Sequence, residues 1–195
     1  MILKYSYWFF KQVIPNNICD LIIKDALIRK IKKGTVGSKD AAPDATVEKL
    51  DTRNSDVVFI NDPWLRHLIH PYIHQANKLA GWNFQLTHSE DPQFTIYEKN
   101  QFYNWHADGF PDPYKNGLIR KLSMTVSLSD PSEYKGGEFE FNIDTDEGRK
   151  NIVCTEVKEK GSIVVFPSHV KHKISPVTKG TRYSLVLWYQ GNPFV

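Results

Sequence analysis

Only two of the 195 residues of this chain are cysteines, Cys19 and Cys154. Two thiols are too few for the disulfide framework on which small secreted domains depend, and a chain of this length does not need one. The scarcity of cysteine therefore favours a cytoplasmic protein.

Long hydrophobic runs and a one-sided charge are also absent. No stretch approaches the roughly 18 apolar residues that a membrane-spanning helix needs, and the N-terminus lacks the small-residue cleavage site of a signal peptide. The 25 Lys and Arg residues exceed the 22 Asp and Glu residues by a net charge of only +3. This excess is too small and too scattered to indicate nucleic acid as a partner, so we expect neither a membrane nor a nucleic acid.

Apolar residues are plentiful enough for a core. The hydrophobic fraction is 41% and the aromatic fraction 13%, and the length predicts a single domain over residues 1–195. Apolar spacing predicts a helix over residues 16–33, with Asn16 or Asn17 as its N-cap, and a second over residues 62–79. Pro71 predicts a kink or a break in the second helix.

The rest of the chain is typical of loops and short strands. Residues 34–50 are small and polar, and they predict a long flexible loop. From about residue 81 onward, short apolar runs alternate with turn residues, which predicts an antiparallel β structure. We expect a mostly β (α+β) fold, a double-stranded β-helix or jelly roll supported by N-terminal helices. Its strands are expected over residues 93–97, 122–128, 138–141, 163–166, 172–175 and 183–189, with a further one over 152–157.

One segment, Trp105-His106-Ala107-Asp108-Gly109, brings a histidine and a carboxylate together. If the segment is extended, residues i and i+2 project to the same face, so His106 and Asp108 converge as metal ligands. His172, at the start of an apolar run, is a candidate third ligand from a neighbouring strand. Two histidines and one carboxylate leave positions open on a metal, as in non-haem Fe(II) oxygenases.

Other histidines compete for a metal. His169 could reach the same ion from the same turn as His172, and spacing alone gives only a mild preference between them. His67, His70 and His74 follow the spacing i, i+3, i+7, which places all three on one helix face where zinc could bind. This second cluster depends on Pro71 not breaking the helix.

Arg182 lies inside an apolar strand, where its burial is costly unless its guanidinium meets an anion. Its planar fork suits a carboxylate. The anion is either a ligand or an Asp or Glu side chain of the protein itself.

Five blocks of sequence occur in an order that resembles one known family, the 2-oxoglutarate- and Fe(II)-dependent dioxygenases, in their prolyl 4-hydroxylase-like branch. The resemblance covers roughly residues 90–190, with a weaker echo in Arg53-Asn54-Ser55-Asp56. The blocks are Gln93-Phe94-Thr95-Ile96-Tyr97, Tyr103-Asn104-Trp105-His106-Ala107-Asp108-Gly109, Tyr134-Lys135-Gly136-Gly137-Glu138-Phe139, the run from Phe166 to Val177, and the run from Gly180 to Trp188.

The resemblance implies roles for individual residues. His106, Asp108 and His172 match the iron ligands, with His172 preferred over His169. Arg182 matches the residue that pairs with the distal carboxylate of 2-oxoglutarate, and Tyr97 matches a donor to the same carboxylate.

Further matches concern the substrate. Tyr103, Arg120 and Trp188 match positions near the substrate, and Phe110 would add to an aromatic barrel interior. Residues 34–50 resemble a mobile loop that closes over a peptide. Some family members have a further tyrosine on the strand that corresponds to residues 123–128. This sequence has Ser123, Thr125 and Ser127 there instead.

The implied function is hydroxylation of a C–H bond, C4 of a peptidyl proline, with 2-oxoglutarate decarboxylated to succinate and CO₂. The implied cofactors are Fe(II), 2-oxoglutarate and O₂, with ascorbate as reductant. The expected partner is a proline-containing peptide or protein, and the expected state is a monomer or weak dimer. The alternatives are a hydroxylase of a non-proline or free small-molecule substrate, and a non-catalytic metal- or 2-oxoglutarate-binding barrel that acts as a sensor.

Overall fold

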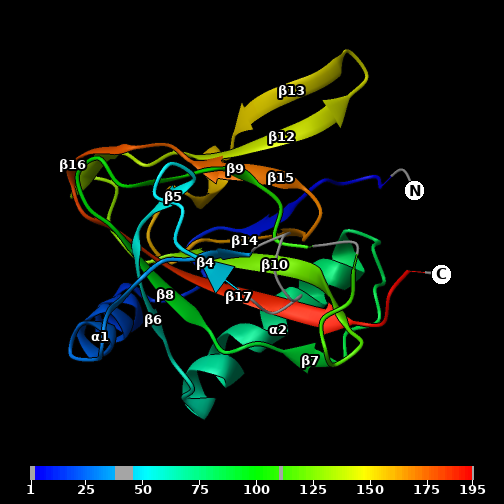
Figure 1. Ribbon diagram of the computed structural model, residues 1–195, viewed down its shortest axis with the longest axis horizontal. Coiled ribbons are helices and arrows are strands. Elements are labelled where there is room, and N and C mark those ends of the chain that lie inside the picture. The colour runs from blue at the N-terminus through cyan, green and yellow to red at the C-terminus, as the bar shows by residue number, and fades with distance from the viewer. Residues whose placement is uncertain (1–2, 38–45, 110–111, 195) are drawn as a thin grey trace.

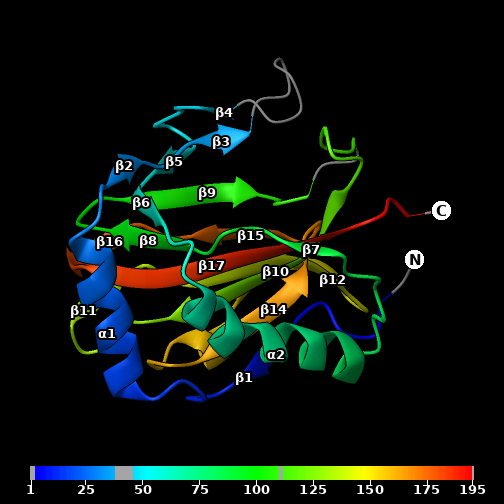
Figure 2. The ribbon, with the colours of Figure 1, turned by 90° about the horizontal axis from the view of Figure 1, so that it is seen from below.

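The computed structural model describes residues 3–37, 46–109 and 112–194. Two large antiparallel sheets lie face to face, and two helices cover the outer face of the larger one (Figures 1 and 2). This arrangement confirms the predicted jelly roll with helical support. No helix in the described ranges has the length and apolar character needed to cross a bilayer.

The larger sheet has eight strands, all paired antiparallel. Its strand order is β1-β14-β10-β17-β8-β6-β2, and β7 pairs separately with β17. In chain order its strands are β1 (Trp8–Phe10), β2 (Lys32–Lys33), β6 (Asp56–Phe59), β7 (His88–Ser89), β8 (Gln93–Tyr97), β10 (Ile119–Ser127), β14 (Ile163–Pro167) and β17 (Arg182–Gly191).

The smaller sheet has five strands in the order β13-β12-β15-β9-β5, and its β12–β13 hairpin projects beyond the body of the molecule (Figure 1). Two two-stranded sheets complete the fold, β11-β16 and β3-β4. These strands are β3 (Val36–Gly37), β4 (Thr46–Val47), β5 (Arg53–Asn54), β9 (Phe102–His106), β11 (Tyr134–Gly136), β12 (Phe139–Thr145), β13 (Gly148–Val153), β15 (Lys171–Ile174) and β16 (Val177–Gly180).

Side-chain alternation along the strands builds two cores. Helices α1 (Asn16–Leu27) and α2 (Pro63–Leu79) pack against one face of the larger sheet, where β17 contributes Leu185 and Leu187. The second core lies between the sheets and includes Phe141 and Phe166. Because successive residues of a strand point to opposite faces, Arg182, Ser184 and the other alternate residues of β17 face the space between the sheets.

The helices differ from the prediction at their ends. The first helix ends at Leu27 rather than at residue 33, because Lys32 and Lys33 pair with β6. No side chain caps its start; the N-cap is Pro15, whose carbonyl accepts from two backbone N–H groups. The second helix continues through Pro71 without the predicted break, and Pro71 is exposed there.

All six firmly expected strands are present, several with longer bounds. The further strand expected over residues 152–157 is wrong, because β13 ends at Val153 and Thr155–Val157 form a turn of 3-10 helix. The flexible loop expected over residues 34–50 is also partly wrong, because β3 and β4 pair within it. Its middle, residues 38–45, lies outside the described residues, so its role as a lid stays a prediction.

Candidate metal centre and active site

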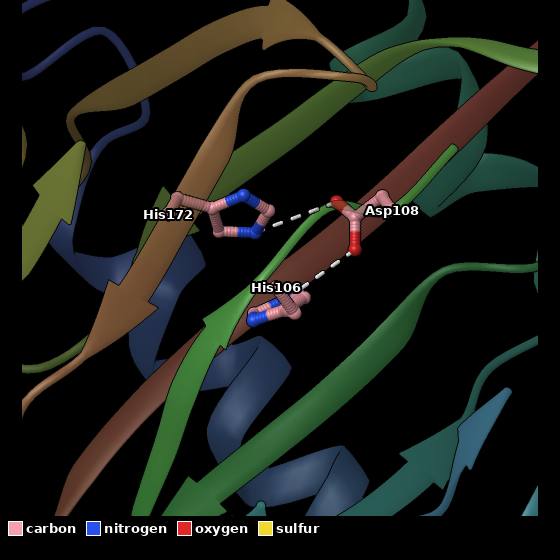
Figure 3. Close-up of side chains that lie close together, drawn as sticks. All are labelled: His106, Asp108 and His172. Carbon is pink, nitrogen blue, oxygen red and sulfur yellow. Dashed lines mark ion pairs between the residues drawn. The ribbon is translucent and has the colours of Figure 1, made fainter. Parts of the chain in front are cut away.

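Three predicted ligands converge on one point between the sheets. His106 is the last residue of β9, His172 lies opposite it on β15, and Asp108 follows two residues after His106. The Nε2 atoms of His106 and His172 each lie 3.6 Å from a different oxygen of Asp108, and Figure 3 shows both rings turned toward that carboxylate. Within the described ranges this is the one group of three such side chains close enough to hold a metal ion.

The hydrogen bonds of the two rings leave their Nε2 atoms available to a metal. Nδ1 of His106 lies 2.7 Å from the carbonyl oxygen of Asn104, and Nδ1 of His172 lies 3.0 Å from that of Val170. A carbonyl can only accept, so each Nδ1 carries the proton. Burial lowers the pKa of His172 to about 4, so its Nε2 has a lone pair at neutral pH. A lone pair facing a carboxylate oxygen is stabilised by a cation between them, and the donor set therefore fits a divalent metal.

Asp108 is buried yet remains ionised. Burial alone would raise its pKa, but His172, His106 and Arg120 outweigh that effect and hold the pKa well below its ordinary value. Its backbone N–H donates to the carbonyl of Ser168 at 2.9 Å, which fixes the carboxylate beyond the end of β9.

A bulge in β9 adds Tyr103 to the same face. His106 pairs with His172 and Tyr103 pairs with Ile174. Between these two pairs β9 therefore has one residue more than β15. An extra residue of this kind rotates the chain locally, and the Tyr103 ring stacks on His106 with centroids 3.4 Å apart. Burial raises the pKa of Tyr103, so it remains a protonated phenol.

The competing histidines do not join this site. His169 is exposed and stands outside the group of three. His70 and His74 do lie close together, with ring centroids 4.3 Å apart, because the helix is continuous through Pro71. However, they pack on Tyr189 at the outer face of the larger sheet rather than near the triad.

A cavity of about 490 Å³ opens from the triad. Its lining includes Tyr97, Tyr103, Arg120 and Trp188, which are four of the residues predicted to bind cosubstrate or substrate. Phe110, also predicted to face the interior, lies outside the described residues.

Arg182, at the start of β17 and only 3% exposed, is not part of the lining of this cavity. It lines a neighbouring hollow, and Phe139 lines both. It forms no ion pair with any carboxylate of the described chain, which argues against an internal partner for its charge. Its Nη1 donates to Ser184 Oγ at 3.2 Å, and its guanidinium carbon lies 5.7 Å from the Tyr97 ring, opposite it on β8. Burial raises the pKa of Tyr97, which therefore stays a donor. A buried cation beside two hydroxyl groups fits a carboxylate ligand such as that of 2-oxoglutarate.

A model of the 2OG-Fe(II) oxygenase superfamily matches residues 92–190 of the sequence. The chain belongs to the 2OG-Fe(II) oxygenase superfamily. The matched region contains the triad, Tyr97 and Arg182, and it begins just before β8 and ends near the end of β17.

Relatives of this superfamily member include the PKHD-type hydroxylases YbiX of Escherichia coli and Shigella sonnei. Each is 36% identical over 101 residues, which are 51% of this chain and 42% of the relative. The alignment therefore spans less than half the length of these curated relatives.

Solved structures show the same fold over nearly the whole chain. A Pseudomonas putida prolyl-4-hydroxylase is 18% identical with a TM-score of 0.67, covering 96% of this chain and 93% of that one. A viral collagen prolyl hydroxylase of Paramecium Bursaria Chlorella virus-1 is 18% identical with a TM-score of 0.65, covering 96% and 97%. A Trichoplax adhaerens prolyl hydroxylase is 14% identical with a TM-score of 0.68, covering 95% and 84%.

Two residues in one wall of the oxygenase cavity, Glu90 and Gln190, have no signal in the sequence. Glu90 forms a two-point ion pair with Arg120, both contacts at 2.6 Å, and accepts from Gln190 at 2.9 Å. The guanidinium carbon of Arg120 lies 3.9 Å from the centre of the Trp188 ring. Glu90 and Gln190 were missed because they come from a loop and a strand end far apart in the sequence. Ser184 was missed too, although its place two residues after Arg182 on a strand puts it on the same face.

Proposed function

We propose that this protein is a 2-oxoglutarate- and Fe(II)-dependent dioxygenase that hydroxylates C4 of a proline residue in a peptide. The observation that carries the proposal is the cavity in which the His106–Asp108–His172 triad and an aromatic wall meet, with the uncompensated Arg182 beside it.

Separate groups of residues bind the metal and the cosubstrate. His106, Asp108 and His172 hold the iron and leave its remaining positions to ligands. Arg182 binds the distal carboxylate of 2-oxoglutarate through its planar fork, with Ser184 and Tyr97 as neutral neighbours. Together, bound Fe(II) and 2-oxoglutarate supply the oxidation: the cosubstrate yields succinate and CO₂, and one oxygen atom of O₂ enters the substrate as hydroxyl. The protein orients both partners and excludes water.

The opposite wall suits a proline in a peptide. Trp188 and Tyr103 line the cavity and give its wall the aromatic character that suits a proline ring. The indole N–H of Trp188 is buried and has no acceptor among the described residues, and a peptide carbonyl would supply one. Three structural neighbours are named as prolyl hydroxylases, which supports this substrate class by fold analogy.

Mass spectrometry of proline-rich peptides incubated with Fe(II), 2-oxoglutarate and ascorbate tests the proposal. We expect the mass gain of one oxygen atom, located on proline, together with succinate. A mass gain on another residue would contradict the proline assignment. Binding of 2-oxoglutarate without formation of succinate would instead indicate a sensor.

A further inference from the structure

A second buried guanidinium, that of Arg53 on β5, lines the cavity of the triad. The residue is only 5% exposed, and it forms no ion pair with any carboxylate in the part of the chain that the structure describes. A buried cation without a counter-charge is costly. Its position in the cavity wall therefore calls for an anionic partner that the described residues do not supply.

Neutral contacts hold Arg53 in one orientation. Its Nε donates to Ser55 Oγ at 2.8 Å, and its Nη1 donates to the carbonyl of Thr35 at 2.9 Å. The chain passes so closely at Gly34 that a Cβ there would lie 2.6 Å from Nε. The third nitrogen, Nη2, has no hydrogen-bond partner among the described residues. The group is thus positioned before a ligand arrives, with one donor nitrogen unused.

The metal centre is close to this guanidinium. The guanidinium carbon lies 4.7 Å from the centre of the Tyr103 ring, and that ring lies 3.4 Å from the His106 ring. Arg53 is therefore at most about 8 Å from a predicted iron ligand. An extended peptide advances about 3.3–3.6 Å per residue, so a group bound by Arg53 lies within a few residues of the oxidised carbon.

Two other arginines, Arg120 and Arg182, lie near the cavity. Arg120 is paired with Glu90. Under the proposed function, one carboxylate of 2-oxoglutarate pairs with Arg182 and the other binds the metal. Of these described guanidinium groups, Arg53 then remains without an anion. We infer that Arg53 binds a carboxylate of the substrate, so that the enzyme prefers a proline next to an acidic residue or at a free C-terminus.

The inference rests on the proposed function and names its substrate class. A carboxylate is favoured among anions because its two oxygens match the planar guanidinium fork. The competing explanation is that Arg53 merely ties residues 34 and 35 to β5, which its contacts with Ser55 and Thr35 would also achieve.

Matched probes separate these explanations. The first pair consists of short peptides with one central proline, in which the neighbouring residue is Glu (acidic probe) or Gln (neutral probe). The second pair consists of peptides that end in proline, with the C-terminus as the free acid (acidic probe) or as the amide (neutral probe). Their dissociation constants and hydroxylation rates are measured for the wild type, Arg53→Gln and Arg53→Lys. Lys33→Gln is the control, because it also removes one positive charge. Lys33 is exposed, lies outside the cavity lining and pairs with Asp56.

We expect the wild type and Lys33→Gln to prefer at least one acidic probe over its neutral match by about tenfold or more, the scale of a close buried charge pair. A preference within the Glu/Gln pair would show that Arg53 binds an acidic side chain, and a preference within the acid/amide pair would show that it binds a free C-terminus. Arg53→Gln should abolish the preference by weakening only the acidic probe, and Arg53→Lys should retain part of it.

Three results would overturn the inference: equal handling of acidic and neutral probes by the wild type, an equal loss for both in Arg53→Gln, or weaker 2-oxoglutarate binding in Arg53→Gln. Hydroxylation of all peptides without preference would support the proposed function and contradict the inference about Arg53. An Arg53-dependent preference in binding, without hydroxylation of proline, would instead support the inference and contradict the proposed reaction.

Discussion

Arg182 and Arg120 are both withdrawn from solvent near the cavity, but their charges are compensated differently. Glu90 satisfies Arg120 at two points. Burial alone would lower the pKa of Arg120, but Glu90 outweighs it and raises the pKa. Arg182 has only the Ser184 hydroxyl as a hydrogen-bond partner among the described residues. Arg120 therefore forms a fixed part of the cavity wall, whereas Arg182 is ready to bind a ligand.

Replacing Arg182 tests its part in cosubstrate binding. Because loss of one partner of a buried charged pair costs about 2–5 kcal/mol, Arg182→Ala should weaken 2-oxoglutarate binding by roughly thirtyfold or more. Arg182→Lys should cost less, since the charge stays but the fork is lost. Titration of the metal-loaded protein with 2-oxoglutarate measures both. Unchanged affinity in Arg182→Ala would mean that the cosubstrate binds elsewhere.

The two neighbouring histidines provide a test of the metal ligands. His172→Ala should lower metal affinity by at least about 10–100-fold, as loss of even an outer-shell partner does, and should abolish turnover. His169→Ala should keep much of both, because His169 is exposed and outside the triad. Equilibrium dialysis against Fe(II) or Mn(II) gives the affinities. Equal losses in the two variants would remove the distinction between them.

Glu90 should act on the substrate through Arg120. Glu90→Gln removes the charge that holds Arg120 against Trp188, so we expect the KM for a peptide to rise by about tenfold while 2-oxoglutarate affinity stays unchanged. Asp91→Asn is the matched control, since its partner is Arg66 outside the cavity lining. A rise in KM in both variants would point to a general effect of the loop.

At the scale of elements, the turn between β11 and β12 packs against the stem of Arg182. Gly137 has φ +66°, and a Cβ there would lie 3.0 Å from Arg182 Cδ and 3.0 Å from Val177 Cγ2. The turn therefore needs glycine both for its backbone conformation and for the space that Arg182 occupies.

Alanine substitutions separate these two needs. Gly81 has nearly the same φ, +70°, but a Cβ added there would meet no described atom within 4 Å. Gly137→Ala and Gly81→Ala should each lose about 1–2 kcal/mol of stability through backbone strain, measured by urea unfolding. Only Gly137→Ala should also weaken 2-oxoglutarate binding. The same affinity in both variants would show that the turn does not position Arg182.

At the scale of the whole molecule, both thiols are enclosed by the two cores. Cys19 is 0% and Cys154 is 2% exposed, and burial raises the pKa of Cys19 to about 11 and that of Cys154 to about 12. Neutral thiols in such surroundings are unreactive.

Two measurements follow from these pKa values. In native protein near pH 8, a thiol reagent should label neither cysteine, and it should label both after denaturation. Because the folded-state pKa values are raised, the stability that these groups contribute is present below the ordinary thiol pKa near 9 and is lost as pH rises to about 11 and 12. Rapid native labelling, or flat stability over that range, would contradict the burial of the thiols.

The features that could be predicted from the sequence are local ones. The alternation along β8 and β17 and the short apolar runs were sufficient to predict the fold class, and the spacing of His106 and Asp108 was sufficient to predict that these two side chains converge. Each depends on the fixed geometry of a strand over a few residues. The family resemblance added the choice of His172 over His169.

The features that depend on pairing between distant segments emerge only in the folded molecule. The first helix stops at Leu27 because Lys32 and Lys33 join β6. Tyr103 reaches the face of His106 because β9 bulges against β15, and Arg120 meets Glu90 across a separation of 30 residues. Such contacts bring together residues whose local sequences carry no sign of one another, since pairing energy from the whole fold overrides local preference.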